Sequence, residues 1–155
     1  MTLPNLLDGT EEFLRAAGHP IPDAPRIPNE DIIALRLKLL VEEVTELMQA
    51  VGFDDLYDYL ECAADDVVAD VVEAAREGGD VDLVEMVDAF HDITVIAFGG
   101  ALETAGADAA RRAADEVTRS NLAKIVDGKV LRRADSKILK PDGWQPPDIA
   151  GALGC

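Results

Sequence analysis

The stretch Leu39–Val51, which reads LLVEEVTELMQAV, decides the fold because it joins an apolar helical pattern to a close group of glutamates. Asn29 and the acidic residues after it favour a helix start, and Gly52 favours a helix end, so the sequence predicts one helix between them. At about 100° per residue, the apolar side chains of this helix form one stripe that faces a core. The stripe consists of Ile33, Leu37, Leu40, Val44, Leu47 and Val51.

A second row, beside that stripe, begins apolar and becomes acidic. Its members are Ile32, Leu35, Leu39, Glu43, Glu46 and Ala50, and Glu42 lies at its outer edge. A glutamate on a solvated surface normally has polar neighbours, whereas Glu43 and Glu46 continue an apolar row. Each glutamate taken alone is most simply interpreted as part of a solvated helix face. The row as a whole indicates a cluster of acidic residues that has a function.

A further helix, predicted from Asp80 to Thr104, repeats this anomaly. It is apolar on more than one side, and yet Glu85, Asp88 and Asp92 follow one another at spacings of three and four residues. Such spacings place the three carboxylates on one face, where like charges repel by about 0.2 to 0.5 kcal/mol per pair even when exposed. We therefore expect a cation beside them, and Mg²⁺ suits a set of oxygen ligands without cysteine.

The remaining pattern predicts an all-α fold, an antiparallel helical bundle of about five helices with a short hairpin or extended C-terminal tail. Thr10 is expected to cap the first helix, and Asp108 the last one. The length fits a single domain over residues 1–155. The three helices not yet mentioned are predicted at residues 10–17, 55–76 and 108–125.

The charge of the chain is strongly negative overall but unevenly distributed. A net charge of -17 repels nucleic acid and anionic membranes, so we expect neither as a partner. Such a distribution is consistent with plain solubility, and it also fits a division in which carboxylates hold a metal and basic side chains hold an anion. Nine of the fourteen basic residues lie in the last third of the chain, namely Arg111, Arg112, Arg119, Lys124, Lys129, Arg132, Arg133, Lys137 and Lys140.

The cysteines and the apolar runs indicate the compartment. Cys62 and Cys155 are isolated, so we expect neither a disulfide framework nor a cysteine metal site. No apolar run approaches the roughly 18 residues that a membrane span requires, and the first residues lack the pattern of a signal peptide. The sequence therefore predicts a soluble, cytoplasmic protein.

Three segments together resemble the all-α NTP pyrophosphohydrolase superfamily, in particular its MazG-like branch with dUTPase activity. Segment 39–51 carries an EExxE motif, and segment 84–102 carries the family's aspartate with the apolar run after it. Segment 116–148 carries Asn-x-x-Lys and Lys-Pro-x-Gly-Trp. In this chain the motif residues are Glu42, Glu43, Glu46, Asp92, Asn121, Lys124, Lys140, Pro141, Gly143 and Trp144.

The likeness covers roughly residues 13–149 and departs from the family at one metal ligand. Three residues before Asp92 the family pattern has a glutamate, whereas this chain has Ala89. Asp88 and Glu85 lie on the same helical face as Asp92, so either of them is a candidate for the missing ligand.

The resemblance implies an enzyme that hydrolyses a (deoxy)nucleoside triphosphate such as dUTP to the monophosphate and pyrophosphate. It implies Mg²⁺ as the cofactor, with Mn²⁺ as a substitute, and a house-cleaning role in the nucleotide pool. The implied catalytic residues are Glu42, Glu43 and Glu46, with Glu42 receiving the proton of the attacking water. The implied metal ligands are Glu43, Glu46, Asp88, Asp92 and Glu85. The implied substrate-binding residues are Asn121, Lys124, Arg133, Lys137 and Lys140.

Two other functions and two assembly states fit the same residues. A phosphoribosyl-ATP pyrophosphohydrolase of histidine biosynthesis would share the fold and the metal chemistry but not the substrate. A non-enzymatic acidic helical interaction module would spread its carboxylates around the helices, whereas here they are confined to apolar rows. The two acid-bearing helices have more apolar surface than a single core can cover. This surplus predicts a homodimer, and a tetramer is also compatible. Trp144, between Gly143 and Pro146, is expected to dock the tail rather than to stack on a base.

Overall fold

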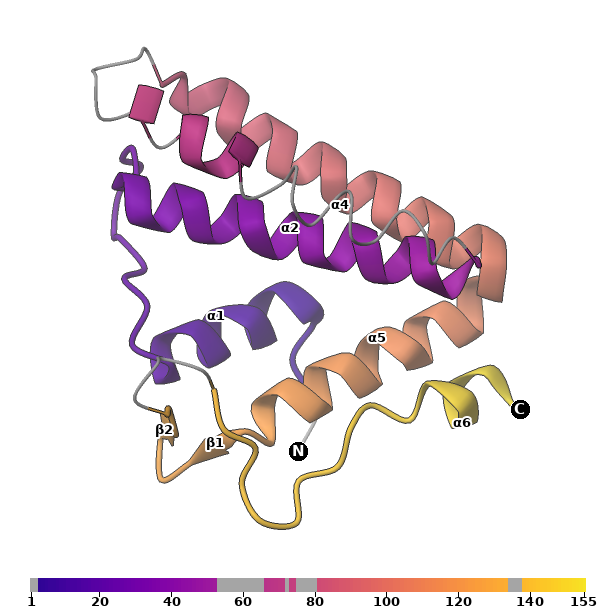
Figure 1. Ribbon diagram of the computed structural model, residues 1–155. Helices are drawn as coiled ribbons and strands as arrows, with labels where there is room; N and C mark the ends of the chain where they lie inside the picture. Colours follow the sequence, from indigo (N-terminus) through magenta and orange to yellow (C-terminus); the bar gives the residue numbers. More distant parts are fainter. Residues whose placement is uncertain (1–2, 53–65, 72, 75–80, 134–137) are drawn as a thin grey trace. The chain divides into compact units, whose positions relative to one another are not determined.

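The computed structural model describes residues 3–52, 66–71, 73–74, 81–133 and 138–155. Residues 66–71 and 73–74 are helical, and the rest of the helix predicted at 55–76 lies outside the described residues. The mostly helical class and the short hairpin near the C-terminus are confirmed. The labelled elements are α1 (Leu6–Ala16), α2 (Glu30–Ala50), α4 (Leu83–Ala105), α5 (Ala107–Leu122), β1 (Ile125–Val126), β2 (Lys129–Val130) and α6 (Ile149–Leu153) (Figure 1).

The chain divides into two compact units. One unit, Pro25–Ala89, contains α2 and the first turns of α4. The other joins Met1–Ala24 to Phe90–Cys155 and contains α1, the rest of α4, α5, the hairpin and α6. Within the described residues, no helix is both long enough and apolar enough to cross a bilayer.

Helix α2 begins and ends as the sequence predicts. Asn29 caps its first turn, because its Oδ1 accepts the N–H of Ile32 at 3.0 Å. Shortly after its end, Gly52 has a φ of +93°, a left-handed value that glycine adopts without strain. Within the helix, the buried Thr45 donates its hydroxyl to the carbonyl oxygen of Val41 at 2.6 Å, so its polar group is satisfied.

Helix α1 begins before the predicted cap, and Asn5 is the residue that caps it. The Oδ1 of Asn5 accepts the N–H of Asp8 at 2.9 Å. The prediction of Thr10 as the cap was wrong, because Thr10 lies inside the helix and donates its hydroxyl to the carbonyl oxygen of Leu6 at 2.7 Å. Asparagine and threonine both favour this position, and only the structure shows which of the two is used.

Helix α4 begins at Leu83, slightly after its predicted start. The carboxylate of Asp82 accepts the N–H of Val84 at 2.9 Å and that of Glu85 at 3.2 Å, so Asp82 satisfies the first turn. The predicted cap, Asp80, lies outside the described residues.

Helix α5 has a different cap and an earlier end than the sequence predicts. Gly106 occupies the cap position without a side-chain hydrogen bond, so the assignment of Asp108 as the cap was wrong. Asp108 instead lies in the first turn and accepts a hydrogen bond from Arg111 at 3.2 Å. The helix ends at Leu122 rather than near Ile125, because residues 125–126 pair in β1.

Helix α1 packs closely on α5, and small residues make this contact. Gly9 is buried in α1, and a Cβ atom at this position would lie 2.6 Å from Cγ2 of Thr118. Thr118 is 3% exposed, and its hydroxyl donates to the carbonyl oxygen of Ala114 at 3.0 Å. The absence of a side chain at Gly9 therefore allows the two helices to approach each other.

The hairpin that follows α5 has a two-residue turn. Strands β1 and β2 pair antiparallel, and Asp127 and Gly128 between them have φ values of 51° and 75°. Positive φ at both turn positions is typical of a type I′ turn, for which Asp-Gly is a favoured sequence. After β2, Arg132 donates from Nη2 to the carbonyl oxygen of Ala17 at 2.8 Å, which attaches this segment to the end of α1.

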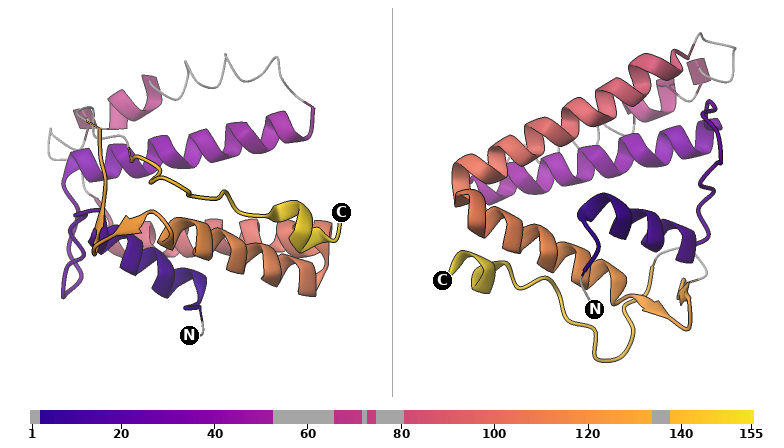
Figure 2. Two further views of the ribbon diagram at one scale, coloured as in Figure 1. Left: turned by 90° about the horizontal axis from the view of Figure 1, so that it is seen from below. Right: turned by 180° about the vertical axis from the view of Figure 1, so that it is seen from behind.

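The C-terminal tail runs back along α5 in the opposite direction, as both views of Figure 2 show. Three contacts at intervals of four residues fix this register. Trp144 bonds to Ser120, Asp148 to Glu116, and Ala152 to Arg112. The tail ends in α6, a helix that the sequence analysis did not predict, which is capped by Asp148 through the N–H of Gly151 at 2.9 Å.

Candidate functional site

The glutamates of the EExxE motif lie in one turn of α2, where they crowd each other. Glu42, Glu43 and Glu46 are all exposed. The pKa of Glu43 is raised above its ordinary value, first because neighbouring protein atoms displace part of the water around this carboxylate and then because Glu46 and Glu42 are nearby like charges. The negative charge of Glu43 is therefore disfavoured in the protein alone, and a bound cation would relieve this cost.

The acids of α4 are arranged in the same way along their own helix. Glu85, Asp88 and Asp92 are exposed, and Ala89 lies between them. In the part of the chain that the structure describes, no hydrogen bond or ion pair with the protein is formed by the side chains of Glu42, Glu43, Glu46, Glu85, Asp88 and Asp92. Among the described residues, the charge of these six carboxylates is thus not compensated by arginine or lysine.

The metal site that the sequence predicts takes its ligands from α2 and α4. Among the described residues, no group of three or more acidic, histidine or cysteine side chains is close enough to hold a metal ion. The oxygen donors that α2 and α4 offer nevertheless match the preference of a hard divalent cation for carboxylate ligands. The chemistry of the donors fits Mg²⁺, and the coordination of an ion by both helices stays a prediction.

A second candidate site consists of basic and aromatic side chains. It lies within the unit that contains α1, α5 and the tail. We call this group the Trp144 cluster, and its members are Phe13, Asn121, Lys124, Lys140 and Trp144. The Nζ of Lys140 lies 4.5 Å from the centre of the Trp144 ring, and that of Lys124 lies 5.5 Å from it. Lys124 Nζ is also 5.6 Å from the Phe13 ring and donates to Oδ1 of Asn121 at 2.9 Å.

Lys124 is the partly buried cation of this cluster, whereas Lys140 is exposed. The pKa of Lys124 is lowered, mainly because partial burial disfavours the charged ammonium and further because Lys140 is a like charge. Within the described residues, neither lysine forms an ion pair with a carboxylate. The two ammonium groups are instead held over aromatic faces, whose negative potential attracts cations without neutralising them.

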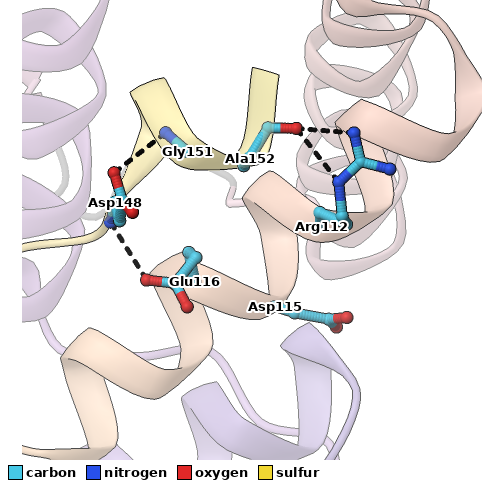
Figure 3. Close-up of a pocket in the computed structure, with 6 residues that line it drawn as sticks. All are labelled: Arg112, Asp115, Glu116, Asp148, Gly151 and Ala152. Carbon is cyan, nitrogen blue, oxygen red and sulfur yellow. Dashed lines mark hydrogen bonds between the residues drawn. The ribbon is translucent and has the colours of Figure 1, made fainter. Parts of the chain in front are cut away.

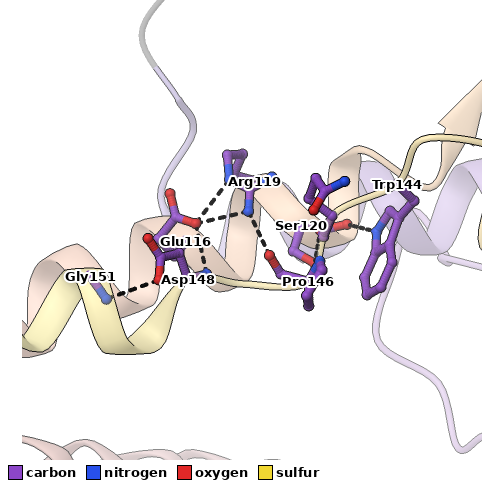
Figure 4. Close-up of polar contacts among 8 residues, drawn as sticks. Glu116, Arg119, Ser120, Trp144, Pro146, Asp148 and Gly151 are labelled. Atoms are coloured by element: carbon purple, nitrogen blue, oxygen red, sulfur yellow. Dashed lines mark hydrogen bonds and ion pairs between the residues drawn. The ribbon is translucent and has the colours of Figure 1, made fainter. Parts of the chain in front are cut away.

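A polar network holds the tail on α5 beside this cluster (Figure 4). Glu116 accepts hydrogen bonds from Arg119 and, at 3.0 Å, from the backbone N–H of Asp148. Arg119 donates in addition to the carbonyl oxygen of Pro146 at 2.9 Å. These contacts lower the pKa of Glu116, and the hydrogen bond from Arg119 contributes most. The network therefore fixes the backbone that follows Trp144.

A shallow pocket of about 340 Å³ lies farther along α5, between this helix and α6 (Figure 3). Arg112 at its edge donates from Nε and Nη2 to the carbonyl oxygen of Ala152, at 3.1 and 2.7 Å. Glu116 and Asp148 are engaged in the tail network. Because most of its polar groups already bond to the protein, this pocket is part of the docking seam and not a candidate for substrate binding.

The structure brings together some of the predicted substrate-binding residues. Asn121, Lys124 and Lys140 meet in the Trp144 cluster, and Arg133 is exposed after β2. Lys137 lies outside the described residues. The expectation that Trp144 docks the tail is confirmed, because its indole N–H donates to the carbonyl oxygen of Ser120 at 2.8 Å.

Phe13 is the member of the cluster that sequence reasoning missed. It lies on α1, far from Lys124 in the sequence, and reaches the lysine only because α1 packs on α5. The helical period of α1 shows that Phe13 belongs to an apolar face, but it does not show which cation that face meets.

No protein-family model and no curated protein match this sequence. Among solved structures, the chain is similar to a protein from Exiguobacterium sp. 255-15 whose crystal structure bears the name "putative NTP pyrophosphohydrolase". The TM-score is 0.70 at 23% sequence identity, and the match covers 99% of this chain and 96% of the other. At this level of identity the likeness shows the fold, and it extends over nearly the whole of both chains.

Proposed function

We propose that this protein is a magnesium-dependent nucleoside triphosphate pyrophosphohydrolase, which cleaves a nucleoside triphosphate such as dUTP into the monophosphate and pyrophosphate. The observation that carries the proposal is the placement of Glu42, Glu43 and Glu46 together on α2, where partial desolvation and then the like charges raise the pKa of Glu43. Perturbed carboxylates without a protein partner are typical of sites that bind a cation. The fold, which is similar to that of a protein named for this activity, supports the same function.

The metal ligands of the proposal come from α2 and α4. We assign Glu43 and Glu46 to one helix and Asp88 and Asp92 to the other, with Glu85 as the alternative to Asp88. When bound, Mg²⁺ would supply positive charge to the phosphate oxygens and lower the pKa of a water molecule. Carboxylates in this number suit Mg²⁺, and also Mn²⁺, better than they suit zinc.

The residues of the chain would divide the remaining work of hydrolysis. The oxygen of a water attacks the α-phosphorus, the bond from this phosphorus to the oxygen that bridges to the β-phosphate breaks, and Glu42 receives the proton of the water. Nucleoside monophosphate and pyrophosphate are the products. On the basic side, the substrate-binding residues would be Asn121, Lys124, Arg133, Lys137 and Lys140, which offer donors to phosphate oxygens.

The proposal includes a homodimer as the working form, with a tetramer as the alternative. In the single chain, several large apolar side chains of α4 are exposed, including Val95 at 68% and Ile96 at 74%. An apolar helix face of this kind is normally covered by another chain. We further propose that residues 1–155 act as one domain.

A release assay for pyrophosphate tests the function. A panel of nucleoside triphosphates together with phosphoribosyl-ATP, each with Mg²⁺, should identify a turned-over nucleotide, and dUTP is our first candidate. Glu46→Gln should lower kcat about 100-fold or more, since even residues that only support a metal ligand contribute 10- to 100-fold. Glu103→Gln, which makes the same charge change at an exposed position of α4, is the matched control and should retain turnover. Equal turnover by Glu46→Gln, or no turnover of any compound, would refute the proposal.

A further inference from the structure

Two cations share one aromatic ring in the Trp144 cluster, although like charges repel. Lys140 and Lys124 both have their Nζ atoms within 5.5 Å of the ring centre. Neither has a carboxylate partner within the described residues. The negative faces of the ring attract each ammonium, so the indole offsets part of the repulsion that would otherwise drive the lysines apart.

The ring itself is held in place from several sides. Its N–H donates to the carbonyl oxygen of Ser120, a residue that is 2% exposed, and the hydroxyl of Ser120 donates to the carbonyl oxygen of Gln145 at 3.3 Å. The network of Glu116 and Arg119 fixes the following residues of the tail. An indole tethered at both its nitrogen and its backbone has little freedom to move, so it can serve as a rigid support.

A tight turn places Lys140 next to this support. The backbone N–H of Trp144 donates to the carbonyl oxygen of Pro141 at 3.0 Å, and Gly143 has a φ of +78°. A positive φ at the third position is the mark of a type II turn, and it brings the residues on either side of the turn close together. Lys140 thereby returns to the ring that the turn leads to.

We infer that Trp144 positions Lys124 and Lys140 as a paired site for a di- or triphosphate group, and that the ring does not serve as a platform for a base. Each ammonium offers three donors and no acceptor, so both call for an anion with several oxygens. A compound with two linked phosphoryl groups presents one group to each lysine. Orthophosphate has a single group and therefore fits the pair less well. The identification of this anion as the phosphate chain of a nucleotide rests on the proposed function.

The cluster contains the only tryptophan of the chain, so the fluorescence of the protein reports directly on it. Inorganic pyrophosphate should be titrated into the full-length protein in the absence of divalent metal, with orthophosphate as the comparison. We expect saturable binding of pyrophosphate at least about tenfold tighter than that of orthophosphate. Equal affinity for the two anions, or no change in emission and no heat in a calorimetric titration, would overturn the inference.

Lysine variants test the pair. Lys124→Gln and Lys140→Gln should each weaken pyrophosphate binding about tenfold, as expected for the loss of a charge-assisted hydrogen bond. Lys129→Gln is the matched control, because Lys129 is an exposed lysine of β2 and makes the same charge change outside the cluster. Unchanged binding by either cluster variant contradicts the pair.

Variants of Trp144, measured by calorimetry, separate positioning from simple tail docking. Trp144→Leu removes the aromatic face, whereas Trp144→Phe keeps a smaller aromatic face and removes the N–H that bonds to Ser120. Trp144→Leu should weaken binding about tenfold, and Trp144→Phe should restore most of the lost affinity. Equal loss in both variants would show that only the tether matters and would overturn the role of the ring.

The kinetics distinguish a failure of this inference from a failure of the proposed function. Lys140→Gln and Trp144→Leu should raise KM about tenfold for the nucleotide that is turned over. If the unaltered protein hydrolyses a nucleotide but these variants keep its KM, the inference alone is wrong. If pyrophosphate binds with the expected lysine dependence and no nucleotide is hydrolysed, the proposed function alone is wrong.

Discussion

The acidic helices α2 and α4 and the basic region formed by α5 and the tail use their charged side chains in different ways. On α2 and α4, the six acids of the predicted site are exposed, and their side chains make no polar contact among the described residues. In the basic region, Arg112, Arg119 and Arg132 donate to backbone carbonyl oxygens and thereby hold segments together. Lys124 and Lys140 differ from these arginines, because they lie over an aromatic ring and have no anionic partner in the described part of the chain.

This difference shows where to look for ligands in a highly charged chain. Arginine suits structural contacts to carbonyl groups, because its planar guanidinium presents several fixed donors. A charge that the protein does not compensate has a cost, and it persists where an ion or a substrate supplies the counter-charge. By this criterion the lysines of the Trp144 cluster and the acids of the predicted site are the functional charges, whereas Arg112, Arg119 and Arg132 are structural. The acids are Glu42, Glu43, Glu46, Glu85, Asp88 and Asp92.

The sharpest test of the acidic helices concerns the metal ligand that the family pattern places at Ala89. We expect Asp88→Asn to lower kcat about 100-fold or more, and Glu85→Gln to have a smaller effect, because Asp88 is one helical turn from Asp92. Pyrophosphate release with Mg²⁺ measures both, and Glu103→Gln again serves as the control on the same helix. A larger loss of kcat in Glu85→Gln than in Asp88→Asn would assign the missing ligand to Glu85. Full activity of both variants would show that neither residue is a metal ligand.

The second test concerns the packing around glycine, which differs between α1, where Gly9 lies against α5, and α4, where Gly100 has free space beside it. Gly9→Ala places a methyl group against Thr118 and should destabilise the protein by about 1 kcal/mol net, because overpacking costs about 1 to 3 kcal/mol and helix propensity returns about 0.5 to 1. Gly100→Ala on α4 is the matched control, since nothing lies within 4 Å of its added methyl group. Denaturant unfolding at constant pH measures both, and equal stability of the two variants would contradict the close contact of α1 with α5.

Much of the fold could be predicted from the sequence where local signals agree. Helix α2 has a cap at Asn29, an apolar period and a stop at Gly52, and the hairpin has the Asp-Gly pair that its turn requires. Helix α6 escaped prediction because its five residues are too few to show a helical period.

The candidate site was predictable only in part. The acidic rows follow from spacing within one helix, and Asn121 and Lys124 are close in sequence. The meeting of Phe13 with Lys124 depends on how α1 packs on α5, which no local pattern specifies. The same holds for Glu116, whose role in the tail network arises from a segment that returns along the helix.

The smallest expected effect concerns the pH dependence of tail docking, which rests on Glu116. The pKa of this carboxylate is lowered in the folded protein, so its contacts contribute stability above the ordinary glutamate pKa of about 4.3, and the contribution is lost as the pH falls through the lower folded value. In Glu116→Gln the acceptor for Arg119 is weaker at every pH. The two proteins should therefore differ in thermal stability near pH 7 and converge below a pH of about 4.

Trp144 emission, recorded over the same pH range, reports the docking of the tail itself. Other carboxylates titrate in both proteins and cancel in the comparison, so a difference that stays constant down to pH of about 3 would show that Glu116 does not hold the tail through its charge.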